Sequence, residues 1–246
     1  MQLSLKYGFV FLCAPKTAST AIQASIESDC DVSFTAHPYY NHITAKSFNE
    51  TFMAFHKSVL PNHILDIFCL IRNPLDWIES WYRFRTREVV KEPTHPHHYN
   101  YTGNISYNDF IEEYLSTGQR EPYADIGTQS DFLMLEDNVV GVDYIFSMER
   151  MDLMHKYLQR KIGKNFEFPK RNVSPKLEVA LDKNMEMRLV KFLERDIALY
   201  EFISKKGMFK KDEHQDDLSN VLEKIHIKNN LTTTSRPYNT PFILKD

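Results

Sequence analysis

The chain has 246 residues, of which 42% are hydrophobic and 26% charged, a composition typical of a globular protein rather than a disordered one. Its 30 Lys and Arg residues nearly balance 33 Asp and Glu residues, so the sequence indicates neither a nucleic-acid-binding surface nor a polybasic membrane surface. Three cysteines, Cys13, Cys30 and Cys69, are too few for a disulfide framework.

The apolar runs are all too short to cross a bilayer, and the first residues lack the pattern of a signal peptide. We therefore expect a cytoplasmic protein without a membrane span. The alternative is the luminal domain of a Golgi-type enzyme without its anchor. In that case glycosylation would be possible at the N-x-[ST] triplets, which begin at Asn49, Asn100, Asn104, Asn172 and Asn230.

The first half of the chain alternates between predicted strands and helices. Short apolar runs bounded by turns predict strands, and apolar residues at intervals of three or four predict helices. Thr44 and Pro74 mark helix starts, as an N-cap and as a first-turn proline. In chain order, the expected elements are a strand at 7–13, a helix at 21–28, a strand at 31–36, a helix at 44–56, a strand at 66–71 and a helix from 74 to about 90.

The second half continues the alternation after a loop at 91–104, whose length suggests a functional lid. The expected elements are a helix at 106–116 capped by Ser106, a strand at 142–148, a helix at 152–162, two helices within 178–205 and a helix at 218–227. This alternation predicts an α/β protein with a central, mainly parallel sheet flanked by helices in three layers. Because the residues after 209 are polar, we divide the chain into a domain at 1–209 and a C-terminal extension at 210–246 that is part helical or loose.

The first candidate site is the turn between the strand at 7–13 and the helix that follows it. Lys16 supplies a cation there, and the helix start supplies unpaired amide groups and a positive dipole, which together favour an anion. Hydroxyl and small side chains in the same turn are those of Thr17, Ala18, Ser19 and Thr20. The Walker A pattern is absent, so we expect an anion cradle from a different branch of the P-loop-like folds. A plain helix cap with one exposed lysine is the alternative.

The second candidate segment begins at Arg72, directly after the apolar strand at 66–71. In open α/β sheets, ligands bind beyond the carboxyl ends of the strands. Ser80 follows a little over two helical turns later, on the side of the helix start. An arginine fork and a hydroxyl can hold one phosphate group. The alternative is a salt-bridged arginine, with Ser80 bonded to its own backbone.

Together these segments resemble those of sulfotransferases that use 3'-phosphoadenosine-5'-phosphosulfate (PAPS). Residues 15–20 are similar to the 5'-phosphosulfate loop of that family, and residues 72–82 are similar to its 3'-phosphate segment. Residues 41–45 resemble a stretch of the branch that includes carbohydrate sulfotransferases and bacterial sulfotransferase family 2 proteins. Further similarity to that branch lies at 129–133, 143–149 and 170–175. The resemblance covers about residues 5 to 204 and implies that 1–209 is a sulfotransferase domain.

This resemblance implies a reaction, a cosubstrate and a set of site residues. A sulfuryl group would pass from PAPS to the hydroxyl of an acceptor, a carbohydrate in the branch named above, and PAP, the 3',5'-bisphosphate, would be released. Lys16 would stabilise the charge that builds on the bridging oxygen of the leaving phosphate. The residues implied to bind the cosubstrate are Lys16, Thr17, Ala18, Ser19, Thr20, Arg72, Ser80 and Arg171.

One position departs from the pattern of this branch. Where the branch carries a second basic residue three positions after the proline, this chain has Trp77. The 3'-phosphate would then be held by Arg72 and Ser80 with help from elsewhere, and the nearest candidates by family analogy are Lys170 and Arg171.

The acceptor hydroxyl must lose a proton, and histidine, with an ordinary pKa of about 6.5, suits a general base. His42 matches the family position between the two PAPS segments, where the acceptor would enter. The alternative for His42 is a loop histidine that caps the helix starting at Thr44. His56 is the second candidate for the base, since it also precedes the strand that ends before Arg72; the solvated end of a helix is its alternative.

We expect no metal, because the anion loop has no acidic partner for Mg²⁺, and His95, His97 and His98 lack a neighbouring carboxylate or cysteine at ligand spacing. Two other functions stay open. A nucleotide or metabolite kinase would need a late Walker lysine and an acidic Mg²⁺ partner, whereas a non-catalytic protein would bind the nucleotide without turnover. The expected partner is a hydroxyl-bearing glycan or small molecule.

Overall fold

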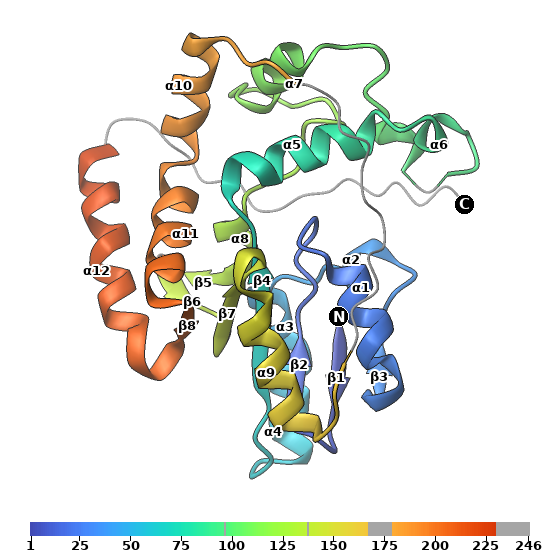
Figure 1. The fold of residues 1–246 in the computed structure, drawn as a ribbon, viewed down its shortest axis with the longest axis vertical. Helices are drawn as coiled ribbons and strands as arrows, with labels where there is room; N and C mark the ends of the chain where they lie inside the picture. Colours follow the sequence, from blue (N-terminus) through green and yellow to red (C-terminus); the bar gives the residue numbers. More distant parts are fainter. Residues whose placement is uncertain (96, 137, 167–178, 230–246) are drawn as a thin grey trace.

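The structure, a computed structural model, describes residues 1–95, 97–136, 138–166 and 179–229. Its main sheet has six strands (Figure 1). In spatial order these are β3 (Val32–Ser33), β1 (Gln2–Ser4), β2 (Phe9–Phe11), β4 (Asp66–Ile71), β7 (Tyr144–Ser147) and β8 (Met208–Lys210). A separate two-stranded sheet consists of β5 (Met134–Glu136) and β6 (Val139–Val140).

The main sheet is mixed. β2, β4 and β7 run parallel at its centre, whereas the pairings of β3 with β1, β1 with β2 and β8 with β7 are antiparallel. The α/β class expected from the alternation of elements is confirmed, but the expectation of a mainly parallel sheet is wrong. β1 and β8, which the sequence reading missed, account for all three of these antiparallel pairings.

β1 carries a weak sequence signal for a physical reason. It is three residues long, and the polar side chains of Gln2 and Ser4 are fully buried in it. Gln2 Nε2 donates to the carbonyl of Gln23 (3.0 Å), and Ser4 Oγ donates to the carbonyl of Asp29 (2.6 Å). These hydrogen bonds offset the burial of polar groups, a compensation that a hydrophobicity pattern cannot indicate.

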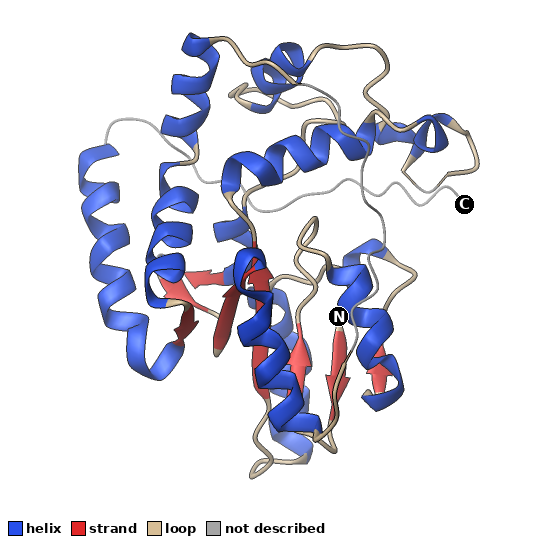
Figure 2. Ribbon diagram, viewed as in Figure 1, coloured by secondary structure: helices blue, strands red, loops and turns tan. Residues whose placement is uncertain are grey.

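Helices cover both faces of the main sheet and make it the middle of three layers (Figure 2). On one face lie α1 (Ser19–Ile26) and α9 (Met151–Ile162), and on the other lie α3 (Ala45–Phe48), α11 (Glu194–Lys206) and α12 (Lys211–Asn229). Successive side chains of a strand point to opposite faces. Phe9 and Phe11 therefore pack in the apolar cluster with α1 and α9, while Val10 and Leu12 pack in the cluster with α3, α11 and α12.

A third group of helices lies beyond the carboxyl ends of the parallel strands and has its own apolar cluster (Figure 1). It consists of α5 (Pro74–Arg85), α7 (Tyr107–Tyr114) and α10 (Lys183–Phe192), and we call it the helical cap. The predicted helix starts are confirmed: the Asn73 side chain caps α5 with Pro74 in its first turn, Ser106 caps α7, and Thr44 caps α3. None of the described helices is long and apolar enough to cross a bilayer.

Several boundaries differ from those expected. The helix expected from 74 to about 90 ends at Arg85, and α6 (Glu88–Lys91) follows separately. The helical stretch at 178–205 breaks at Leu193, between α10 and α11. The domain boundary drawn after residue 209 falls inside β8. Beyond it, α12 places Leu218 and Leu222 in the main core, so this part of the extension packs against the sheet.

Candidate active site

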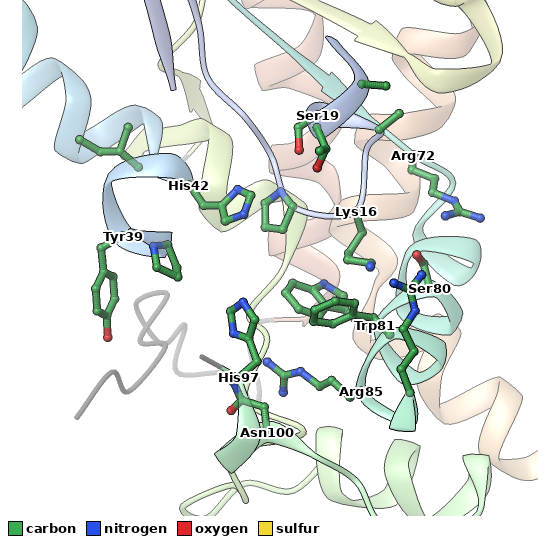
Figure 3. A pocket seen from close by; sticks show the side chains of 18 of the residues that line it. Lys16, Ser19, Tyr39, His42, Arg72, Ser80, Trp81, Arg85, His97 and Asn100 are labelled. Carbon is green, nitrogen blue, oxygen red and sulfur yellow. The ribbon is translucent and has the colours of Figure 1, made fainter. Parts of the chain in front are cut away.

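A pocket of about 770 Å³ lies between the carboxyl ends of the parallel strands and the helical cap (Figure 3). Because β2 and β4 are adjacent and parallel, the loops that follow them reach the same edge of the sheet. The first loop contributes Lys16 and the second contributes Arg72. Other walls come from α5, from α2 (Pro38–Asn41) with the residues after it, and from the loop at 91–104. The two candidate segments, far apart in sequence, thus meet in one pocket.

The loop after β2 has an unusual backbone conformation. Lys16 has a φ of +63° and Ala18 a φ of +59°, in the left-handed region, which costs a non-glycine residue about 1–2 kcal/mol. Such conformations are concentrated at ligand sites. α1 begins directly afterwards at Ser19, and the side chain of its N-cap, Ala18, makes no capping hydrogen bond.

The structure separates the predicted loop residues into two groups. Those that line the pocket are Lys16, Ala18, Ser19 and Thr20. Thr17 does not line it: the side chain is fully buried, and its Oγ1 donates to the carbonyl of Ala14 (2.8 Å). Thr17 therefore stabilises the turn rather than facing a ligand.

The second segment also reaches the pocket, since both Arg72 and Ser80 line it. Trp77, which occupies the position of a second basic residue in the resembled branch, is buried and does not line the pocket. Lys170 and Arg171 lie outside the described residues. Arg72 and Ser80 are therefore the predicted residues of the 3'-phosphate segment that the structure brings together.

The pocket is strongly electropositive. Lys16, Arg72, Arg85 and Arg87 line it, and its described lining includes no Asp or Glu. Burial, and after it the charges of Arg87, Arg72 and Arg85, together lower the pKa of Lys16 to about 7. The Lys16 Nζ lies 4.2 Å from the ring centre of Phe84. A cavity with these charges favours a polyanion.

His42 lies at the end of α2 and lines the same pocket, as Figure 3 shows. Its Nδ1 lies 2.6 Å from the carbonyl oxygen of Cys13, which can only accept, so Nδ1 carries the proton. Nε2 is then the acceptor, and the Asn41 side-chain amide lies 3.5 Å from it. Burial lowers the pKa of His42 to about 4, and the charge of Lys16 acts in the same direction. His42 is therefore a neutral imidazole with its lone pair on Nε2.

The structure does not bring His56 to the pocket. This side chain lies on α4 (Ala54–Val59), and its Nε2 is 3.1 Å from Nδ1 of His63. His63 in turn contacts the carbonyl of Leu5, in the turn between β1 and β2 (2.9 Å). That turn precedes β2, whereas Lys16 follows it. The pair of histidines therefore lies at the amino-terminal end of β2, opposite to the end that carries Lys16.

Sequence reasoning missed part of the pocket. Trp81 and Phe84 have the helical spacing of core residues, yet they line the pocket together with Arg85. His95 and His97 also line it, from the loop at 91–104 for which the sequence did suggest a functional lid, and burial lowers the pKa of His97 to about 4. Among the described residues, no group of three or more His, Cys, Asp or Glu side chains has the arrangement of a metal site.

A comparison of the chain with protein-family models and with curated proteins finds no match. The assignment of a function therefore depends on the chemistry of the pocket and on the motifs that form it.

Proposed function

We propose that this chain is a sulfotransferase that moves a sulfuryl group from PAPS to an acceptor hydroxyl, with a P-loop-like arrangement of its nucleotide site. The observation that carries the proposal is the meeting of Lys16 and Arg72 at the ends of adjacent parallel strands. Each of these residues comes from one of the two segments that resemble PAPS-binding motifs. A volume of about 770 Å³ suits a nucleotide with part of an acceptor, since small-molecule sites span roughly 300–1,000 Å³.

The pocket residues fit the charges of the cosubstrate. Lys16 and the first turn of α1 would hold the 5'-phosphosulfate, whose negative charge suits a cation and a helix start. Arg72 and Ser80 would hold the 3'-phosphate. The absence of carboxylates from the described lining means that no fixed negative charge opposes a bound bisphosphate.

His42 is suited to the base of this reaction. Its neutral Nε2 would take the proton of the acceptor hydroxyl while the hydroxyl oxygen forms a bond to sulfur. The bond from sulfur to the bridging phosphate oxygen breaks in the same transfer, and its electron pair leaves with PAP. Lys16 would stabilise the negative charge on that oxygen.

The acceptor would enter beside α2 and the loop at 91–104. Tyr39 and Tyr40 line the pocket and pack against His37, and because they remain 41% and 51% exposed, the exposed parts of their rings can stack on a sugar or another flat apolar face. His97 and Asn100 supply polar groups on another wall. A carbohydrate hydroxyl is thus the acceptor class that we propose.

The experiment that tests the function is transfer of ³⁵S from labelled PAPS to a panel of glycans, lipids and small alcohols. We expect labelled product with at least one hydroxyl acceptor, and no product with the Lys16→Ala variant. Binding of PAP without transfer to any acceptor would instead favour a non-catalytic nucleotide-binding protein. Phosphoryl transfer from ATP would favour the kinase alternative.

A further inference from the structure

One glutamine outside the pocket lining holds the backbone of Arg72. Gln129, the first residue of α8 (Gln129–Leu133), is 4% exposed. Its Nε2 donates to the carbonyl of Arg72 (2.8 Å), and its Oε1 accepts from the amide of Arg72 (2.9 Å). A single side chain thus pairs both backbone groups of the residue that follows β4, as a neighbouring strand would.

Gln129 is itself held by a buried carboxylate. Asp196, on α11, is 2% exposed, and its two oxygens accept from the amides of Gln129 (2.8 Å) and Ser130 (2.9 Å). A carboxylate at the first turn of a helix interacts favourably with the helix dipole as well as with these amides. The contacts form a continuous path from Asp196 through Gln129 to Arg72.

We propose that Gln129, fixed by Asp196, is a positioning residue that sets Arg72 for the 3'-phosphate. This inference rests on the proposed function. The backbone of Arg72 lies just beyond the last paired residue of β4, Ile71, so none of the described strands pairs with it. The two hydrogen bonds from Gln129 supply that constraint and leave the guanidinium directed to the pocket. A functional group is effective only when its support holds it in place.

The amide is the side chain that this role requires. It presents a donor and an acceptor side by side, whereas glutamate lacks the donor and methionine, of similar length, lacks both. Gln129→Met should therefore release the backbone of Arg72 while filling much of the same space. Gln129→Glu keeps the length and one acceptor, and provides a second variant if the first does not fold.

The test measures how much the 3'-phosphate contributes to binding. Dissociation constants are measured for adenosine 5'-monophosphate, which lacks the 3'-phosphate, and for PAP, and the ratio of the first constant to the second is compared between variants. We expect Gln129→Met to reduce this ratio by about tenfold, the effect of roughly one charged hydrogen bond, with little change for the monophosphate. Arg72→Ala marks the complete loss of the contact.

The matched control is Tyr114→Phe. Tyr114 is fully buried in the same region, and its hydroxyl donates to the carbonyl of Gly127 (2.9 Å), two residues before Gln129. This variant should lower the unfolding temperature and keep the wild-type ratio. If the wild type prefers PAP and Gln129→Met keeps that preference, or Gln129→Glu keeps it where Gln129→Met does not fold, the inference is overturned. If the wild type itself has no preference for PAP, it is the proposed function that fails.

Discussion

The indole Nε1 of Trp77 donates a hydrogen bond of 2.8 Å to the carbonyl of Pro15, the residue directly before Lys16. Trp77 is 1% exposed, so this bond forms inside the protein and joins α5 to the loop that follows β2. The resembled branch has a basic residue at this position. Here, a buried neutral donor instead fixes the loop that carries Lys16 relative to the helix that carries Ser80.

Replacement of Trp77 by Phe tests this connection. The change removes the donor and leaves the Pro15 carbonyl unpaired, at a cost of about 1–3 kcal/mol in the free energy of unfolding. We also expect turnover to fall by about tenfold or more, because small displacements of a reacting group reduce the rate steeply. Thermal unfolding and single-turnover transfer from PAPS measure the two effects.

The control for this variant lies on the same helix. Tyr82 of α5 donates from its hydroxyl to the carbonyl of Ile105 (2.9 Å) and does not line the pocket. Tyr82→Phe should lower stability by a similar mechanism and keep turnover close to that of the wild type. Equal turnover in the Trp77 and Tyr82 variants would show that the contact with Pro15 has no influence on Lys16.

The lowered pKa of Lys16 predicts that anion binding takes up a proton. In the free protein this pKa is about 7, so most of the Lys16 side chains are neutral at pH 8. Negative charge brought by PAP favours the protonated form and raises the pKa. Isothermal titration at pH 8, in buffers with different ionisation enthalpies, should show net proton uptake. Lys16→Met should abolish most of it, and an unchanged uptake in this variant would assign the proton to another group.

The same pKa shift makes Lys16 a cost to stability in the free protein. Since the pKa falls from its ordinary 10.5 to about 7 on folding, the unfolded chain binds more protons between these values. Stability therefore rises with pH across that interval through this group. Lys16→Met should unfold at a higher temperature than the wild type at pH 7, and the difference should shrink toward pH 10. A variant less stable at pH 7 would contradict this account.

His42 and His56 form a natural pair for testing the base. His42→Ala should lower kcat by about 10²–10⁴ and leave PAP affinity nearly unchanged. Because His56 does not line the pocket, His56→Ala should keep kcat. The ordinary pKa of histidine would place the acidic limb of kcat/KM for PAPS near pH 6 to 7. The lowered pKa of His42 moves it well below that range. An acidic limb that persists in His42→Ala would exclude His42 as its source.

The sequence was sufficient to predict features that depend on local chemistry. The caps at Thr44 and Ser106 follow from side chains that accept backbone hydrogen bonds, the helix start at Pro74 follows from a first-turn proline, and the two anion segments follow from the ends of apolar strands. Such signals are contained within a few neighbouring residues, and for that reason they can be recognised without knowledge of the tertiary structure.

Features that depend on tertiary contacts could not be predicted in this way. Apolar spacing cannot distinguish a core residue from the wall of a pocket, and for this reason the spacing of Trp81 and Phe84 on their helix does not indicate that they line the pocket. Both His42 and His56 precede β4 in sequence, but the chain turns between them and places them at opposite edges of the sheet. The buried polar residues of β1 obscured a strand and, with it, the mixed character of the sheet.

The central claim is that this pocket recognises a nucleotide with separate 3' and 5' anions. The measurement that tests it most directly is the affinity of the wild type and of Arg72→Ala for PAP and for ADP. These two ligands share an adenosine and two phosphates but differ in where the second phosphate is attached. We predict that the wild type binds PAP at least about tenfold more tightly than ADP and that Arg72→Ala removes the preference. Equal affinities for PAP and ADP in the wild type would contradict the account.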